Sequence, residues 1–451
     1  MGVVIQIGQL LLSLSILIIL HELGHFLFAR LFNTRVEKFY LFFDPWFSLF
    51  KFKKGDTEYG IGWLPLGGYV KISGMIDESM DREQLKQPPQ PWEFRSKPAG
   101  QRLLIMLGGV LVNLVLGFLI YSAVLFVWGE KYLPNKNLTD GLWCVDSTAL
   151  DIGFRNGDKI ISINGYEPQR YEDIYREIIF GGDVRVLRDN KVDSFFVPTD
   201  FIGSLVKERN LMLFYPRVPF IIREVPDTSV NSSSGLQPKD QLVSINSIPV
   251  KYYDQYLDIA DTLAAGTYKV GVLRDGNPVN LTLTLTDQKK LEVLTLIPNF
   301  DELEKLGMYQ LETRTFSFLE AIPAGFKLAG TQLSFYIKQF KLIFDFKTGA
   351  YKGLGGFGTI GGLFPKVWSW EAFWEITAFL SLILAFMNVL PIPALDGGHV
   401  MFLLYEIVTR RKPSEKFMEY AQIVGMVIII GLLIFANTND ILRGIEKWFN
   451  K

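Results

Sequence analysis

The sequence contains very few of the residues that mark disulfide-bonded or nucleic-acid-binding proteins. Cys144 is the one cysteine among 451 residues, so no intrachain disulfide can form. Lys and Arg (46) nearly balance Asp and Glu (47), and the net charge of −1 gives no electrostatic basis for binding nucleic acid. No Lys or Arg precedes Arg30, so the basic start of a cleavable signal peptide is missing. Histidine is also scarce, with only His21, His25 and His399.

Charged residues make up only 21% of the chain, whereas hydrophobic residues make up 49% and the mean hydropathy is +0.21. This balance is typical of a protein that lies partly in a membrane and partly in water. A membrane-spanning helix needs about 20 apolar residues. Segments at about 3–32, 103–128 and 374–395 qualify, and a shorter apolar core at about 423–436 begins near Phe417. We therefore expect a polytopic α-helical membrane protein with about four transmembrane helices.

The short connections between these spans differ in their content of Lys and Arg. Ten such residues lie in segment 33–101 and four lie in segment 409–418, whereas residues 1–29 contain none. Short loops rich in Lys and Arg stay on the cytoplasmic side of a membrane. We expect both basic connections to be cytoplasmic and the region between the second and third spans to lie on the opposite side.

That long region, about 130–370, contains an internal repeat. Residues 153–168 (GFRNGDKIISINGYEP) resemble residues 235–250 (GLQPKDQLVSINSIPV), and VLRDN at 186–190 recurs as VLRDG at 272–276. The aligned polar pairs are Asp158 with Asp240 and Asn164 with Asn246. These linked matches predict two copies of one β-rich module of about 80 residues.

Two further segments follow the repeat. Residues 316–346 carry Phe, Leu and Ile at spacings of three and four with lysines between them, which predicts an amphipathic helix. Such a helix could lie on the membrane surface or pack against the second module, and the sequence leaves both open. Residues 353–362 (GLGGFGTIGG) are expected to interrupt regular structure.

The first span contains the sequence HELGH at 21–25. On a helix, residues four apart share a face, so His21 and His25 can bind one metal ion. Zinc suits nitrogen and carboxylate ligands in an open tetrahedral site. Glu22 can act as general base toward a water molecule and then carry the proton to the leaving amine. Ionisable residues inside a membrane are costly and are functional as a rule, which favours a site over polar side chains that merely face a helix bundle.

A third protein ligand is expected from the end of the third span, in the stretch NVLPIPALDGGH. Pro391 and Pro393 remove backbone donors and break the helix. The distorted chain can then aim Asp396 at the metal and leave Asn388 free to hold an extended peptide. His399 is the alternative third ligand, or it orients the aspartate.

HELGH in the first span, N-x-x-P-x-P-x-L-D-G-G in the third and the tandem repeat between spans two and three together resemble the site-2 proteases, more narrowly their bacterial regulator-of-sigma-E-protease branch. The resemblance covers nearly the whole chain and implies an intramembrane zinc endopeptidase with one zinc ion. The matching positions are His21, His25 and Asp396 for the metal, Glu22 for the catalytic base, and Asn388, with Pro391 and Pro393 beside it, for the substrate backbone.

The resemblance identifies the repeat as two PDZ domains, at 138–218 and 219–300. Neither copy contains a clear carboxylate-binding loop, so we expect a filter that excludes bulky ectodomains rather than peptide capture. Residues 60–74 match the family's re-entrant β loop, expected here at 55–75, where substrate could add as a strand. An ordinary cytoplasmic hairpin is the alternative. The expected substrate contacts in this loop are Gly67, Gly68 and Tyr69.

The rest of the chain is expected to form a first membrane part at 1–130, a linker with the amphipathic helix at 301–370 and a second membrane part at 371–451. The resemblance implies a bacterial cytoplasmic (inner) membrane protein with periplasmic PDZ domains. The implied substrates are single-span membrane proteins already trimmed by an upstream site-1 protease, such as anti-sigma factors and remnant signal peptides. The expected partners are thus these proteins and the lipid bilayer, without nucleic acid.

The second span departs from the family pattern, because GGVLVN lacks the proline that usually precedes its Asn, and we predict no role for Asn113. Two other functions remain to be weighed. A metal-dependent transporter or channel would need polar residues in several spans, and the second and fourth spans are nearly free of them. A PDZ scaffold without catalysis would not need Glu22 between the two histidines.

Overall fold

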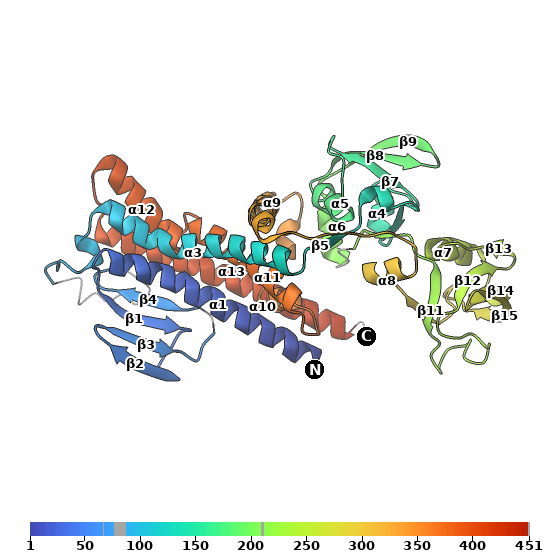
Figure 1. The fold of residues 1–451 in the computed structure, drawn as a ribbon, viewed down its shortest axis with the longest axis horizontal. Coiled ribbons are helices and arrows are strands. Elements are labelled where there is room, and N and C mark those ends of the chain that lie inside the picture. Colours follow the sequence, from blue (N-terminus) through green and yellow to red (C-terminus); the bar gives the residue numbers. More distant parts are fainter. Residues whose placement is uncertain (66, 76–86, 209–211, 450–451) are drawn as a thin grey trace. The chain divides into compact units, whose positions relative to one another are not determined.

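The structure is a computed structural model that describes residues 1–65, 67–75, 87–208 and 212–449. It divides into two compact units, and Figure 1 labels their helices and strands. The first unit comprises Met1–Gly129, Thr315–Lys341 and Leu354–Lys451, and the second comprises Glu130–Arg314 and Leu342–Gly353. We call them the membrane unit and the β-rich unit.

Among the described residues, four helices of the membrane unit are long and apolar enough to cross a bilayer, as expected. They are α1 (Gly2–Leu31), α3 (Ala99–Val127), α11 (Trp370–Val389) and α13 (Glu415–Phe449). Helix α13 extends beyond the expected apolar core at 423–436, because it continues through polar residues at both ends.

The third span is shorter than expected. Its helix α11 ends at Val389 rather than near residue 395, and α12 (Asp396–Thr409) begins after a six-residue break. Pro391 and Pro393 lie in this break, where their missing N–H groups cannot continue a helix. The predicted interruption is therefore present, and Asp396 is the first residue of the following helix.

Helix α3 lies at the centre of the membrane unit, since it packs against α1, α11 and α12. It approaches α1 closely where Gly108 faces Gly24, and a Cβ atom on either glycine would collide with the backbone of the other. Small residues allow helix backbones to come this close in membranes. The contact brings the HELGH segment against α3.

A four-stranded sheet packs on α1 through its strands β1 and β4. The strands are β1 (Val36–Leu41), β2 (Phe50–Lys54), β3 (Thr57–Ile61) and β4 (Tyr69–Ile72), in the order β2-β3-β1-β4. Strand β1 is parallel to β3 and antiparallel to β4. The segment 55–75 is thus not a simple hairpin, because β3 and β4 pair with β1 on opposite sides; Leu66 within it, like residues 76–86, lies outside the described residues.

Two further helices complete this unit. The predicted amphipathic segment forms α9 (Phe318–Phe344), whose buried residues Ala321 and Ala329 pack with apolar residues of α3 and α11. The glycine-rich segment 353–362 was expected to be irregular, but part of it forms the short helix α10 (Phe357–Gly362). Helix α10 contacts α1 and α13. A 3₁₀ turn, η1 (Phe94–Ser96), precedes α3.

The β-rich unit contains two separate hydrophobic cores. Around the first core lie β5 (Glu130–Tyr132), η2 (Asn135–Asn137), β6 (Leu142–Cys144), α4 (Ser147–Asp151), β7 (Lys159–Ile163), α5 (Tyr171–Ile178), β8 (Gly182–Arg188), β9 (Lys191–Val197), α6 (Phe201–Glu208) and β10 (Phe214–Pro216). Around the second lie β11 (Phe220–Glu224), β12 (Gln241–Ile245), β13 (Ile248–Pro249), α7 (Tyr253–Thr262), β14 (Gly266–Arg274), β15 (Asn277–Leu285) and β16 (Leu294–Leu296). The remaining elements are α8 (Phe300–Lys305), β17 (Glu312–Arg314) and η3 (Ala350–Gly353).

The two stretches that match in sequence have matching local structure. Asp158 binds Arg188 at 2.8 Å and also accepts the amide of Arg155, while Asp240 binds Arg274 at 2.7 Å and accepts the amide of Gln237. The asparagines that end β7 and β12, Asn164 and Asn246, have φ values of 52° and 51°. Asparagine tolerates this left-handed conformation better than most residues. In both stretches, therefore, an aspartate–arginine pair and a left-handed asparagine flank one strand.

Candidate metal centre

The two histidines of HELGH lie on one face of α1 and are both buried. His21 is 8% exposed and His25 is 6% exposed, and their Nε2 atoms are 3.3 Å apart. The i, i+4 spacing on a continuous helix produces this proximity. The ring planes are nearly perpendicular, at 82°, and the two Nε2 atoms face the same small space.

Asp396 completes a group of three. Its Oδ2 lies 3.2 Å from His21 Nε2 and 3.3 Å from His25 Nε2. Within the described residues this is the group of His, Cys, Asp and Glu side chains close enough to hold a metal ion, and His399 is not a member. Helix α12 begins at Asp396, so its carboxylate is fixed by the break between α11 and α12.

The donor set fits a zinc ion. Bonds of about 2.0–2.1 Å at tetrahedral angles separate ligand atoms by about 3.3 Å, which is the spacing of these three atoms. Asp396 Oδ2 is buried and accepts no hydrogen bond from the described residues. A buried carboxylate oxygen without a donor is costly unless a cation is bound to it. The two nitrogens and this oxygen are thus aimed at a common point.

Residues of α3 orient both imidazoles. His25 Nδ1 lies 2.8 Å from the carbonyl oxygen of Ile105, to which it can donate, and this leaves Nε2 without a proton. His21 Nδ1 lies 3.1 Å from the side-chain amide of the fully buried Asn113. The amide atom nearest the ring is Asn113 Nδ2, and Asn113 Oδ1 is buried without a hydrogen-bond partner among the described residues. With these two amide atoms exchanged, Oδ1 accepts from the ring N–H, and Asn113 then fixes the tautomer of His21 in the same way. No role was predicted for Asn113 from the sequence, although a single strongly polar residue in an apolar span was a signal for one.

Gly109 of α3 leaves the room that the two rings occupy. A Cβ atom there would lie 2.5 Å from His25 Nε2 and 2.6 Å from His21 Cε1. Both distances are shorter than real carbon contacts, so any larger residue would displace the rings. Gly109 could not be identified from the sequence, because its role depends on how α3 is rotated against α1.

Glu22 faces the start of β4. A Cβ atom on Gly68 would lie 3.4 Å from Glu22 Cγ and 2.6 Å from Ile18 Cγ2, so the strand passes closely over this part of α1. Gly67 has a φ of 152°, within the region that favours glycine. Tyr69 donates to Asp44 Oδ1 at 2.8 Å. Of the expected loop contacts, Gly68 therefore lies near Glu22, whereas the Tyr69 hydroxyl is bonded to Asp44.

The remaining predicted residues lie in the last turn of α11 and in the break that follows it. The Asn388 amide nitrogen is 3.4 Å from His21 Nε2, so this half-buried side chain reaches the metal-facing side of the ring. Pro391 is exposed, whereas Pro393 packs against Gly398 and Gly425. Asn388 is thus the residue of these three that contacts a histidine within the described part of the chain.

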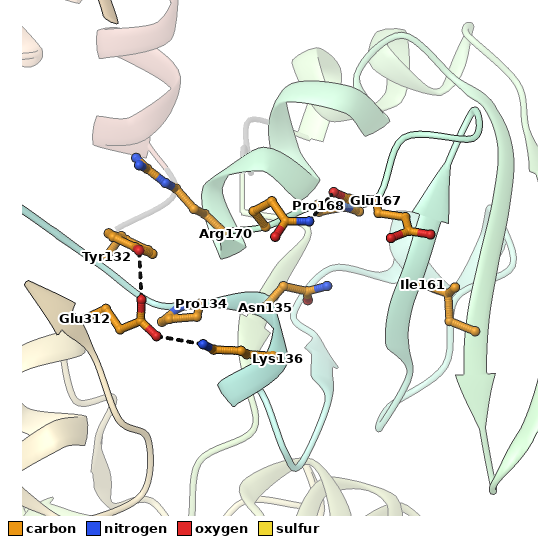
Figure 2. A pocket seen from close by; sticks show the side chains of 10 residues that line it. Tyr132, Pro134, Asn135, Lys136, Ile161, Glu167, Pro168, Arg170 and Glu312 are labelled. Atoms are coloured by element: carbon orange, nitrogen blue, oxygen red, sulfur yellow. Dashed lines mark hydrogen bonds and ion pairs between the residues drawn. The ribbon is translucent and has the colours of Figure 1, made fainter. Parts of the chain in front are cut away.

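The β-rich unit has a separate hollow of 370 Å³ beside β5 and the segment before α5 (Figure 2). Two of its charged residues pair with each other: Glu312 pairs with Lys136 at 2.9 Å and also accepts a hydrogen bond from Tyr132 at 2.9 Å, as the dashed lines in Figure 2 show. The cysteine of this unit, Cys144, is buried, and burial raises the pKa of its thiol to about 12. A thiol that stays protonated is a poor metal ligand.

Known proteins resemble this chain over almost its entire length. Residues 9–432 match the description of peptidase family M50. The "Regulator of sigma E protease" of Haemophilus influenzae is 25% identical over 468 residues, covering 97% of this chain and 99% of the relative. A protein of Campylobacter jejuni named for the zinc metalloproteases is 27% identical, with 96% and 92% covered. The "Regulator of sigma-E protease RseP" of Escherichia coli is 24% identical, with 97% and 98% covered. The chain belongs to peptidase family M50, the site-2 protease family, and is a zinc metalloendopeptidase.

Proposed function

We propose that this protein cleaves peptide bonds inside the membrane-spanning segments of single-span proteins, with zinc held by His21, His25 and Asp396. The observation that carries the proposal is the spacing of 3.2–3.3 Å among three buried ligand atoms on helices of the membrane unit. Ligands would lie at this depth because the bond to be cut lies there too. Zinc bound at this site supplies Lewis acidity toward the scissile carbonyl and lowers the pKa of water.

Glu22 is the general base in this proposal. It takes a proton from the attacking water and delivers it to the leaving amine. Ile105 and Asn113 hold the imidazoles through their Nδ1 atoms, which keeps both Nε2 atoms directed at the ion. In this arrangement α1 supplies Glu22 and the two histidines, α3 supplies the groups that orient the imidazoles, and α12 supplies the third ligand.

The substrate is presented as an extended strand. A transmembrane helix hides its carbonyls in internal hydrogen bonds, so it must unwind before attack. Within the described part of the sheet, β4 is the end strand and has β1 as its strand neighbour, and the start of β4 passes Glu22, so an unwound segment can add along the other side of β4. Gly67 and Gly68 leave the backbone accessible there, and Asn388 binds the substrate backbone on the side of α11.

The β-rich unit acts as a size filter made of two PDZ domains, residues 138–218 and 219–300, on the periplasmic side of the inner membrane. The basic connections 33–101 and 409–418 support this orientation. In the first domain, the hydroxyl of Tyr171 donates to the carbonyl of Phe214 at 2.7 Å, and the Phe214 amide donates to Tyr175 at 2.8 Å. With both backbone groups of Phe214 bonded, a peptide cannot pair with β10 at this residue, which favours exclusion over capture.

The substrates are single-span proteins already trimmed by a site-1 protease. Relatives that regulate sigma E support anti-sigma factors as one class, and remnant signal peptides are a second class of the same chemistry. Both are short-tailed apolar segments that could enter from the lipid bilayer.

A cleavage assay tests the proposal. Purified protein in lipid nanodiscs is expected to cut a short-tailed single-span substrate within its apolar segment. Glu22→Gln is expected to lower the rate by about 10²–10⁴-fold while zinc stays stoichiometric. Asp396→Ala is expected to lose zinc and cleavage together. Zinc retained in Asp396→Ala but lost in His399→Ala would instead assign His399 as the third ligand. Full cleavage by Glu22→Gln would rule out its role as the base.

A further inference from the structure

Helix α13 lies against the break that precedes Asp396. Its apolar surface is mostly exposed, as expected for a helix facing lipid, but Gln422 is only 4% exposed. Gln422 Oε1 accepts a hydrogen bond from the backbone N–H of Ala394 at 3.2 Å. Asparagine and glutamine side chains are costly in apolar surroundings unless they are bonded, so this contact needs a reason.

The partner residue has an unusual backbone. Ala394 has a φ of 85°, in the left-handed region that residues with a Cβ atom rarely adopt. It lies two residues before Asp396, directly after Pro393. Such a conformation persists only when its surroundings determine it, and it occurs most often beside functional sites. The bond from Gln422 is one of the contacts that hold it.

Gly425 provides a second contact from the same face of α13, one turn further on. The carbonyl oxygen of Pro393 lies where a Cβ atom of residue 425 would be, so only glycine fits. The neighbouring residues Ile423 and Val424 are exposed. Helix α13 therefore contacts two successive backbone groups of the break. The Pro393 carbonyl packs against Gly425, and the Ala394 amide donates a hydrogen bond to Gln422.

The other end of the break is packed equally closely. A Cβ atom on Gly398 would lie 2.6 Å from Pro393 Cα, and Gly397 faces the carbonyls of Val389 and Leu390. The bend is thus enclosed between α11, the first turn of α12 and α13. Asp396 follows the bend directly, and its Oδ2 must lie within a few tenths of an ångström of the position the two histidines require.

We propose that Gln422 and Gly425 are positioning residues for Asp396. They fix the backbone of Pro393 and Ala394 and thereby place the third carboxylate at His21 and His25. The inference rests on the proposed ligand role of Asp396. It gives the fourth span, which contributes no ligand, a defined task in building the metal site.

Metal binding by the full-length protein tests this directly. Zinc affinity is measured by competition with a chelator, and the visible spectrum of Co²⁺ in place of zinc reports the coordination. Gln422→Met keeps the length of the side chain but removes the acceptor, and it is expected to weaken zinc binding by about 10–100-fold and to alter the Co²⁺ spectrum. Gln422→Glu keeps an acceptor oxygen and is expected to restore both readouts.

Gly425→Ala is the second, independent variant and is expected to weaken zinc binding as well. Its matched control is Gly431→Ala on the same helix, where an added Cβ atom meets nothing within 4 Å. Should Gln422→Met fail to fold, Gly425→Ala and its control decide the question. Helicity of the metal-free forms separates a local effect from unfolding.

The outcomes distinguish this inference from the proposed function. Wild-type zinc affinity in both Gln422→Met and Gly425→Ala, with zinc lost from Asp396→Ala, would overturn the positioning role and leave the ligand assignment standing. Loss of zinc from Gln422→Glu at normal helicity would contradict the role given to the acceptor oxygen of residue 422. Wild-type zinc affinity in Asp396→Ala would overturn the ligand assignment, and the positioning role with it.

Discussion

At the scale of single residues, the candidate metal centre joins His21 and His25 of α1 with Asp396 of α12, and the sequence signals that predict these three side chains are local. His21 and His25 are four residues apart on a helix, and Asp396 follows a pair of prolines that must end one. The groups that orient the imidazoles could not be predicted, because they lie 80 and 92 residues away on α3. Sequence spacing fixes which residues share a face of one helix, but it does not fix the rotation of that helix against another.

Gly109 gives the sharpest prediction at this scale. In Gly109→Ala the new methyl group overlaps both imidazoles, so the rings must shift away from their common point. We expect zinc affinity to fall by about tenfold or more, with cleavage falling alongside it. Gly100→Ala, in the same helix, adds its methyl group where nothing lies within 4 Å and serves as the control. Equal zinc affinities for the two variants, measured by chelator competition, would contradict the assigned role.

At the scale of elements, the spacing of the apolar residues in α9 predicted a helix but not which of its faces is packed. The Phe, Leu and Ile positions predicted an amphipathic helix, and the helix is present. Its buried side, however, consists of the small residues Ala321, Gly325 and Ala329, and a Cβ atom on Gly325 would collide with Ser122 of α3. Small side chains let helices pack closely in membranes, whereas large apolar ones can face lipid. The repeating Phe, Leu and Ile positions therefore did not indicate the face of α9 that packs against other helices.

Helix α10 forms because a distant residue caps it. Asp440 of α13 accepts hydrogen bonds from the amides of Gly356 and Thr359 at 3.0 and 2.9 Å, and from the Thr359 hydroxyl at 2.5 Å. An aspartate that accepts the first free N–H groups stabilises a helix by about 0.5–2 kcal/mol. Within GLGGFGTIGG no residue supplies such a cap, so the sequence of this segment alone favoured an irregular structure.

Removing that cap should loosen α10. In Asp440→Ala we expect the amides of Gly356 and Thr359 to exchange hydrogen faster, because their acceptor is gone. A double-mutant cycle with Thr359→Val measures the coupling between the two side chains, which should exceed about 0.5 kcal/mol. Unchanged exchange at both amides, or strictly additive effects on thermal stability, would show that α10 is held by its other contacts with α1 and α13.

At the scale of the whole molecule, composition and the positions of the apolar runs were enough to expect membrane spans and a long β-rich region between the second and third. The details that could not be predicted involve residues far apart in the chain. Segment Leu342–Gly353 belongs to the β-rich unit although it begins within the last turn of α9, and residues Thr315–Lys341 belong to the membrane unit. Both assignments depend on tertiary contacts, such as that between Gly203 and Thr348, that leave no local pattern.

The chain enters and leaves the main part of the β-rich unit through a pair of strands. Strand β5 pairs antiparallel with β17, and Tyr132 is opposite Glu312. Facing residues of an antiparallel pair have Cα atoms about 4.5–5.5 Å apart. Residues 133–311 can therefore be replaced by a short Gly-Ser turn without moving the two ends, which makes the filter hypothesis testable by deletion.

If the β-rich unit only excludes bulky substrates, this deletion should leave the chemical step almost intact. All proposed catalytic and ligand residues lie in the membrane unit, and binding that does not favour the transition state adds nothing to the rate of the chemical step. We expect cleavage of short-tailed substrates within about tenfold of wild type, and new cleavage of substrates that retain a folded ectodomain. Stoichiometric zinc in the deletion form shows that the helices still pack. A zinc-loaded deletion form that cuts neither class would mean that the β-rich unit positions the substrate itself, since the metal site would then be complete but unable to engage any peptide.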